Sequence, residues 1–490
     1  MGGDERADRS SENPSRRGVL KGLAAVAAAP LVAWGPAAAR TAWAAGRAPA
    51  VLRAPGSLPF PGRAAGTNMI PQIEHIVVLM MENHSYDNKL GMLGRRGADG
   101  FTLGANGKPV ASNPYPGGTK VQHAFRMPTT CQARGPSQTW DASHIAYHGG
   151  RNDGFVDASG AVSMGYWERA DQPFYYSLAS VFPIADRYFC SVLGQTFPNR
   201  RYLMAGTSLG MVNDDQVIDL AKYPKNGTIF DQLNKHKISW KNYWSSTPTT
   251  LLFPGLFTRD PANALRLAKI EHFYTDAAAG KLPGFCIVEP DFGDSSEENP
   301  QNIAAGEAFA AKVINAVMSG PKWGSTLLVW TYDEHGGYYD HVPPPAAIPP
   351  DSIGPDGFLG GPHYDGFGRY GFRVPCAVVS PWARPGYVSH TVFDHTSILK
   401  LVETKWNLPA LTKRDANASN MLDMLDFSHP AFRTPPKLAK PLISVDPATR
   451  LGQRLTSQSL IRNGRWRLPA SPGSRLTVCG RRGLSCGRHT

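Results

Sequence analysis

The sequence predicts an α/β domain built around a mostly parallel central sheet. Three apolar runs, at residues 76–81, 326–331 and 376–380, have the continuous apolar character of strands that are covered on both faces. A helical pattern at residues 304–318 precedes the second run, and its apolar side chains recur on one face. This alternation of strand and helix is typical of α/β proteins.

Length and composition support one large domain with extensive loops. The chain has 490 residues, of which 42% are hydrophobic, so it contains ample material for a buried core. Its 50 glycines and 42 prolines indicate many turns and irregular connections. A fully disordered chain and a simple helical bundle are both excluded.

The net charge of +12 comes almost entirely from the two ends of the chain. Residues 451–490 contain eight Arg and no acidic residue, and residues 1–50 contribute +3, which leaves +1 for the 400 residues between. The folded body is therefore nearly neutral, and nothing in its sequence indicates a basic groove for nucleic acid. The Arg-rich tail is interpreted as a solvated segment, with peripheral contact to anionic membrane headgroups or a cell wall as the alternative.

The N-terminal residues have the pattern of an export signal. Arg16 and Arg17 precede an apolar run at residues 22–34, and small-residue cleavage sites follow at residues 37–39 and 42–44. The adjacent arginines favour export of the folded protein by the twin-arginine (Tat) machinery, to the extracellular space or the cell wall. We expect four segments: a signal at 1–45, a linker or arm at 46–72, a catalytic domain at 73–435 and a tail at 436–490.

Polar side chains directly follow the first two predicted strands. Glu82 and Asn83 come after the strand at 76–81, and Asp333 and Glu334 come after the strand at 326–331. Ligands of open α/β sheets bind beyond the carboxyl ends of the strands. Carboxylate and amide oxygens suit hard divalent cations, although such residues are also common in ordinary loops. Two such clusters at equivalent strand ends favour a metal site.

A candidate nucleophile lies in the segment from Gly194 to Arg201. Pro198 is expected in the first turn of a helix, which places Thr196 at or near the N-cap. Free N–H groups at a helix N-terminus attract phosphate groups, although a threonine there is often a simple cap.

Taken together, these motifs resemble those of bacterial phosphoesterases that include phospholipases C and acid phosphatases. The resemblance extends over roughly residues 73–410, in the order of the family. It implies an alkaline-phosphatase-like three-layer sandwich with long active-site loops, and a divalent metal ion (Mg²⁺, Mn²⁺, Ca²⁺ or Zn²⁺). The matching blocks are residues 73–87, 194–200, 289–291, 332–342 and 394–399.

The same resemblance implies roles for individual residues. The implied metal ligands are Glu82, Asn83, Asp333 and Glu334. Thr196 matches the nucleophile, and Asn199 matches a residue that contacts the phosphate. His341 is assigned to catalysis, and the expected substrate-binding residues are Gln138, Arg200, His335 and His395.

The sequence departs from the family pattern at two points. Gln138 stands where many members have a histidine, and residues 297–301 stand where a His-Pro pair is usual. The leading interpretation is phospholipase C-type hydrolysis of a phosphodiester, with a phospholipid or another phosphate ester as substrate. A phosphomonoesterase of the acid phosphatase type and a non-catalytic exported binding protein on the same scaffold are the alternatives.

Overall fold

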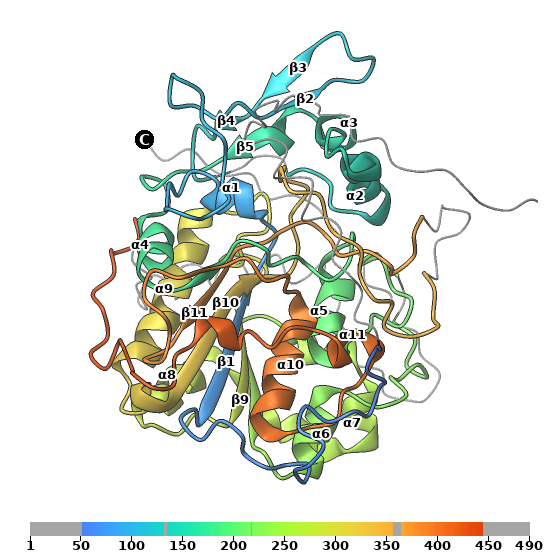
Figure 1. The fold of residues 1–490 in the computed structure, drawn as a ribbon, viewed down its shortest axis with the longest axis vertical. Coiled ribbons are helices and arrows are strands. Elements are labelled where there is room, and N and C mark those ends of the chain that lie inside the picture. The colour runs from blue at the N-terminus through green and yellow to red at the C-terminus, as the bar shows by residue number, and fades with distance from the viewer. Residues whose placement is uncertain (1–50, 132–134, 217, 356–363, 444–490) are drawn as a thin grey trace, which may run out of the picture. The chain divides into compact units, whose positions relative to one another are not determined.

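The computed structural model describes residues 51–131, 135–216, 218–355 and 364–443, which belong to one compact unit. Its centre is an eight-stranded sheet with the order β12-β6-β11-β10-β1-β9-β7-β8 (Figure 1). The strands of this sheet are β1 (His75–Met81), β6 (Ile184–Ala185), β7 (Trp240–Trp244), β8 (Leu267–Lys269), β9 (Phe285–Glu289), β10 (Thr326–Tyr332), β11 (Cys376–Val379) and β12 (Val388–Ser389).

The α/β class and the mostly parallel sheet predicted from the sequence are confirmed. β1 pairs in parallel with both β10 and β9, and all seven of its residues are buried, as a continuous apolar run requires. β9 continues in parallel to β7, and β7 to β8. β11 pairs antiparallel with β10 and with β6, so it enters the sheet in the opposite direction.

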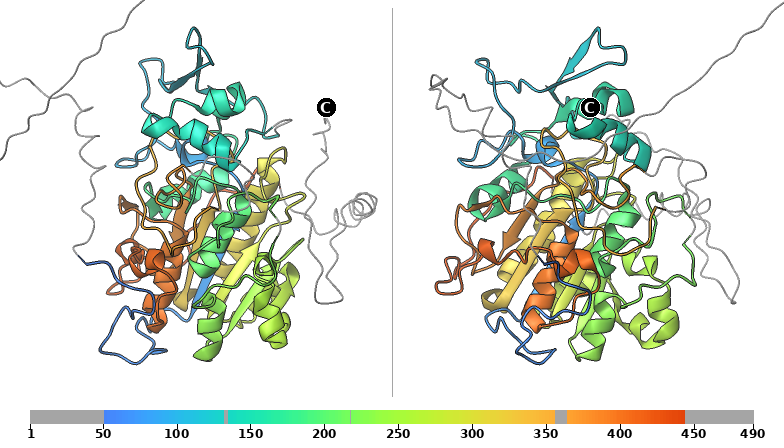
Figure 2. Two further views of the ribbon diagram at one scale, coloured as in Figure 1. Left: turned by 90° about the vertical axis from the view of Figure 1, so that its right-hand side faces the viewer. Right: turned by 45° about the vertical axis from the view of Figure 1, so that its right-hand side comes forward.

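Helices cover both faces of the sheet and give three layers (Figures 1 and 2). α4, α8 and α9 lie on one side, and α5, α6, α10 and α11 lie on the other. The helix predicted at residues 304–318 is α9. The helices are α1 (Tyr86–Leu90), α2 (Trp140–Tyr147), α3 (Phe155–Ser159), α4 (Pro173–Val181), α5 (Thr196–Ala205), α6 (Ile229–Lys235), α7 (Gly255–Arg259), α8 (Ile270–Ala278), α9 (Ile303–Ser319), α10 (His395–Trp406) and α11 (Lys413–Ala416). Short 3-10 turns are η2 (His148–Gly150), η3 (Ala161–Met164), η4 (Thr249–Leu252), η5 (Pro261–Arg266), η6 (Trp323–Ser325) and η7 (Leu422–Met424).

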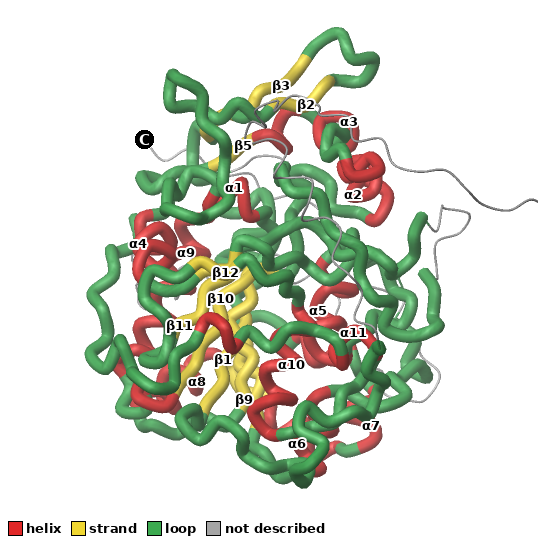
Figure 3. The backbone as a smooth tube through the Cα atoms, viewed as in Figure 1, coloured by secondary structure: helices red, strands yellow, loops and turns green. Residues whose placement is uncertain are grey.

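A smaller layer lies beyond the carboxyl ends of the parallel strands. It contains α2, α3 and two short ribbons, and long loops separate it from the central sheet (Figure 3). One ribbon pairs β2 (Ser112–Pro114) with β3 (Val121–His123), and the other pairs β4 (Phe125–Arg126) with β5 (Gly165–Tyr166).

The described part of the expected linker, residues 51–72, is an arm that packs on the fold. Gly66 N–H donates to the carbonyl of Trp406, and Met69 N–H donates to the carbonyl of Lys405, both near the end of α10. The expected signal at 1–45 and residues 444–490 of the expected tail lie outside the described residues. Within the described part of the chain, no helix combines the length and apolar character needed to cross a membrane.

Candidate functional site

The sheet brings the two predicted polar clusters together. Met81 is paired with Tyr332 at the ends of β1 and β10, and Asp333 N–H donates to the carbonyl of Met81. Glu82 and Asn83 therefore lie beside Asp333 and Glu334. All four side chains are almost completely buried. The carboxyl ends of two adjacent parallel strands deliver them to one place, as the sequence predicts.

Three side-chain oxygens converge at this point. With its oxygen turned inward, the Asn83 amide places Oδ1 3.0 Å from Asp333 Oδ1 and 3.0 Å from Glu334 Oε1. Such oxygens repel one another unless a cation lies among them, whereas the rotated amide would donate two hydrogen bonds instead. Glu82 Oε2 is also buried and has no hydrogen-bond partner among the described residues. The three converging oxygens of Asn83, Asp333 and Glu334 are of the kind that a hard divalent cation prefers.

Two backbone positions make this convergence feasible. Asn83 has a positive φ of 75°, which turns its side chain back toward β10. Gly336 has a φ of 65°, and a Cβ atom on it would lie 1.9 Å from the Asn83 carbonyl oxygen. Only glycine allows this close approach. Gly336 N–H in turn donates to Glu334 Oε2 at 2.7 Å.

Arg200 is the main counter-charge of the cluster. Its Nε donates to Asp333 Oδ2 at 2.9 Å, and its Nη atoms lie 3.6 Å from carboxylate oxygens of Glu82 and Glu289. Burial nevertheless raises the pKa of Glu82 and of Glu334, and the charge of Asp333 adds to both shifts. One guanidinium thus leaves carboxylate charge that a bound cation would neutralise.

Thr196 lies next to this cluster at the start of α5. Gln195 is the N-cap and Thr196 the first helical residue, so Thr196 is close to the cap position predicted from Pro198. Thr196 Oγ1 is 3.4 Å from Asn83 Oδ1. In the first turn of α5, Phe197 N–H donates to Asp214 Oδ1 and Pro198 has no N–H, so it is the dipole of the helix that favours an anion at this position.

Asn199 holds the loop that leads to Thr196. Its Oδ1 accepts from the N–H groups of Ser191 and Val192, and its Nδ2 donates to the carbonyls of Gly194 and Gln195. The amide is buried and its hydrogen bonds go to this loop. In the structure, Asn199 therefore positions Thr196, and its predicted phosphate contact stays a prediction.

The histidines of the matched blocks have different environments. His395 donates from Nε2 to the carbonyl of Asp333 at 2.7 Å and accepts from Tyr188 at Nδ1, so it holds the backbone at Asp333. Burial lowers its pKa to about 4. His335 packs against Phe372 and Phe155, and burial lowers its pKa to about 3. Both rings are neutral at pH 7, and their predicted contacts with substrate stay predictions.

His341 lies in a separate ionic network. Its Nδ1 is 2.7 Å from Asp87 and its Nε2 is 3.1 Å from Asp99, and these carboxylates raise its pKa to about 9 against the effect of burial. Asp87, Asp340 and His341 are close enough together to hold a metal ion. However, Arg373 binds Asp87 and Asp340 at 3.1 and 2.8 Å, and its positive charge opposes a cation there. None of these contacts links His341 to Thr196.

The structure adds acidic residues that the sequence analysis did not assign to the site. Asp214 Oδ1 accepts from Phe197 N–H at 2.7 Å, directly after Thr196. Burial raises the pKa of Asp214 to about 8, and the charges of Asp333 and Glu298 add to the shift. Glu289 is the last residue of β9. Glu82 and Asp333 were found because they follow predicted strands, and Glu289 would have been found in the same way if residues 285–289 had been assigned as a strand. Asp214 gave no such signal, because it lies in an irregular loop.

The two departures from the family pattern lie near these acids. Gln138 is buried, and the carbonyl of its neighbour Ser137 would be 2.5 Å from a Cβ atom on Gly337. Ser296, just before the second departure, accepts the hydrogen bond of Glu82 N–H at 2.9 Å. The charge of Glu298 contributes to the raised pKa of Glu82.

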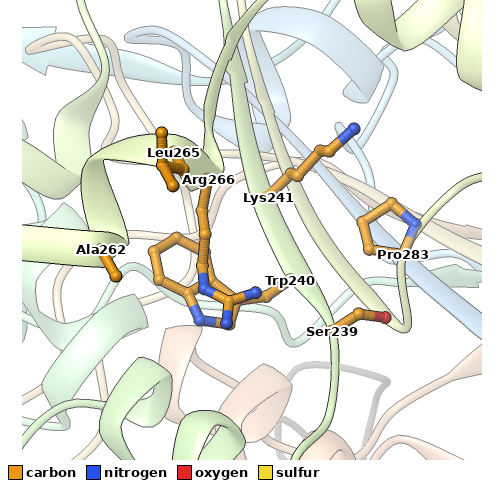
Figure 4. A pocket seen from close by; sticks show the side chains of 7 residues that line it. All are labelled: Ser239, Trp240, Lys241, Ala262, Leu265, Arg266 and Pro283. Carbon is orange, nitrogen blue, oxygen red and sulfur yellow. The ribbon is translucent and has the colours of Figure 1, made fainter.

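A pocket of about 290 Å³ lies away from this cluster, at the opposite ends of the strands (Figure 4). Trp240 begins β7, Leu265 and Arg266 precede β8, and Pro283 precedes β9, so these residues mark the amino ends of parallel strands. The aromatic stretch at residues 240–244 is strand β7 within the sheet.

Comparisons with known proteins identify the family. Residues 73–409 match the model of the phosphoesterase family, and this chain belongs to that family. It is 31% identical over 445 residues to phospholipase C B of Mycobacterium tuberculosis, covering 79% of this chain and 83% of that protein. It is 33% identical over 384 residues to non-specific phospholipase C1 of Arabidopsis thaliana, covering 70% and 69%. The solved structure of a protein in the alkaline phosphatase superfamily, from Vibrio parahaemolyticus, aligns with 78% of this chain and with 76% of its own chain, at 9% sequence identity. Its TM-score of 0.35 is too low to add to the fold described above.

Proposed function

We propose that this chain is an exported phospholipase C that cleaves a phosphodiester with Thr196 as nucleophile. The observation that carries the proposal is the position of the Thr196 hydroxyl at the start of α5, beside the converging oxygens of Asn83, Asp333 and Glu334. The phospholipase C names of the relatives support a diester as substrate.

Glu82, Asn83, Asp333 and Glu334 would hold the metal ion. When bound, a divalent cation supplies charge neutralisation at the phosphoryl oxygens and lowers the pKa of a hydroxyl group beside it. Arg200 fixes the carboxylate of Asp333, and His395 fixes its backbone carbonyl. The protein thereby preorganises the site before substrate binds.

The chemistry of the chain's own residues proceeds in two steps. Thr196 Oγ gives up its hydroxyl proton to solvent and forms a bond to phosphorus while the bond to the leaving alcohol oxygen breaks, and the alkoxide takes up one proton. We assign that proton to Asp214, because its carboxyl group lies at the start of α5, where it accepts from Phe197 N–H, and burial raises its pKa to about 8. Water then cleaves the phosphothreonine and releases the phosphate monoester. Asp214→Asn retains the acceptor for Phe197 N–H, and unchanged turnover in this variant would refute the assignment.

The experiment compares two soluble substrates. Protein stripped of metal and resupplied with Mg²⁺, Mn²⁺, Ca²⁺ or Zn²⁺ is tested on p-nitrophenylphosphorylcholine and p-nitrophenyl phosphate. We expect faster cleavage of the choline diester, and a loss of at least about 100-fold in Thr196→Ala and in Asp333→Asn. Near-normal turnover in either variant would refute that residue's role.

The alternatives predict other results. A preference for the monoester would indicate an acid phosphatase. No turnover of either substrate with any metal would favour a non-catalytic binding protein, which is the consequence expected if the absent family histidines are essential.

Export is proposed on the N-terminal sequence alone. Arg16 and Arg17, followed by an apolar run and small-residue sites, support the twin-arginine route. Replacing both residues with lysine should abolish export of the chain from a bacterium with an active twin-arginine pathway. Continued export in that variant would exclude this route.

A further inference from the structure

Residues 100–124 form two consecutive hairpins that the chemistry above does not use. In the first, Gly104 N–H donates to the carbonyl of Lys108 at 2.8 Å, and the second is the β2–β3 ribbon. They project beyond α2 and α3, at the same end of the molecule as α1 (Figures 1 and 2). Because α1 follows β1, this is also the end at which the polar cluster lies. We call residues 100–124 the projecting hairpins.

One face of the projecting hairpins is anchored and the other is free. The buried Asn113 accepts from Phe155 N–H at 2.8 Å and donates to the carbonyl of Asn152 at 3.1 Å, which holds β2 against α3. Side chains alternate along a strand, so Pro114 points to the opposite face from Asn113. Val121 pairs with Pro114 and shares this outward face.

The projecting hairpins combine exposed aliphatic groups with positive charge. Leu103, Val110 and Val121 are 47%, 55% and 53% exposed. Exposed aliphatic residues are unremarkable singly, but these three lie on one projection. Lys108 and Lys120 are also exposed, and neither has an ion-pair partner among the described residues. From residue 100 to residue 140 the sequence contains no Asp or Glu.

We propose that the projecting hairpins dock the protein on the surface of an anionic phospholipid bilayer. The aliphatic side chains would enter the interface, and the lysines would pair with headgroups. The acid-free stretch argues for this partner, because an extended negative surface complements it in charge. The inference rests on the proposed phospholipase function, because docking through the hairpins would place the end of the sheet that carries Thr196 next to the phospholipid substrate.

The test measures vesicle binding by the full chain in cosedimentation at low salt. The vesicles contain equal parts of phosphatidylcholine and phosphatidylglycerol. One variant combines Leu103→Ser, Val110→Ser and Val121→Ser, and a second combines Lys108→Gln and Lys120→Gln. The control combines Leu265→Ser and Lys281→Gln, because these exposed residues precede β8 and β9 at the opposite ends of the strands.

We expect each hairpin variant to lower the apparent vesicle affinity about tenfold or more, and the control to bind like the wild type. Residues outside the described ranges are identical in all variants, so differences report on the hairpins. Wild-type affinity in both hairpin variants, or an equal loss in the control, would overturn the proposal. If the aliphatic variant does not fold, the lysine variant alone decides.

Binding is measured without turnover, so the two proposals can fail separately. Hairpin-dependent binding by a wild-type protein that cleaves neither nitrophenyl substrate would retain the docking surface and refute the proposed enzyme. Turnover of the choline diester, together with vesicle binding that does not depend on the hairpins, would support the proposed enzyme and refute the docking surface.

Discussion

The ammonium group of Lys89 and the carboxylate of Glu297 form an ion pair from which solvent is fully excluded. Tyr175 and Tyr332 donate to the two carboxylate oxygens at 2.5 and 2.8 Å, and the ammonium lies 5.3 Å from the centroid of Trp167. Glu297 has a positive φ of 77° and is adjacent to Glu298. The pair thus fixes the segment whose Ser296 carbonyl binds Glu82 N–H.

Removing one partner of this pair should be costly. Lys89→Met leaves a buried carboxylate without a counter-charge, and we expect a loss of about 3–5 kcal/mol in the free energy of unfolding. The double variant that combines Lys89→Met with Glu297→Gln should lose much less of the free energy of unfolding, because neither charge is then left without its partner. Chemical denaturation of both single variants and the double variant measures the coupling, and simple additivity would show that the two charges do not interact.

The close approach of Gly336 to Asn83 gives a second prediction. In Gly336→Ala, the new methyl group would overlap the Asn83 carbonyl at a positive φ, so the metal-ligand loops must shift. We expect a lower melting temperature and at least about tenfold lower turnover. Gly324→Ala is the matched control, because no atom lies within 4 Å of its Cβ position. Equal behaviour of the two variants would contradict the packing argument.

Metal binding should appear as a change in thermal stability, independent of activity. A divalent cation bound only by the folded state raises its melting temperature. Glu334→Gln removes one converging carboxylate, so this variant should gain much less from added metal while its metal-free form stays stable. Asp215→Asn, which changes an exposed acid, should respond like the wild type. A full metal response in Glu334→Gln would exclude Glu334 as a ligand.

The His341 network predicts a stability that falls at alkaline pH. Its folded-state pKa of about 9 is above the ordinary value of 6.5. The protonated ring therefore contributes fully below about pH 6.5, and the contribution is lost as the pH rises through 9. The loss should be at most about 3 kcal/mol. Denaturation at pH 6, 7, 8 and 9 should show this slope in the wild type and a weaker one in His341→Asn. Parallel curves would refute the assignment.

Local patterns in the sequence determined three strands of the central sheet, β1, β10 and β11, and the metal-ligand candidates. The continuous apolar run before Glu82 and the one before Asp333 can only be buried strands, and the shared direction of parallel strands places their following residues together. Pro198 likewise fixed the start of α5 to within one residue. The family motifs were confirmed by the match at residues 73–409.

Only the tertiary structure decided what each polar side chain contacts. Asn199 is committed to its own loop, His395 to the backbone of Asp333, and His341 to a network around Arg373. Asp214 and Glu297 enter from loops whose sequence has no periodicity. Side-chain partners distant in sequence depend on how loops pack over the sheet. The pattern of residues along the chain does not specify how loops pack. It therefore predicted where the strands end, but not the network of side chains around those ends.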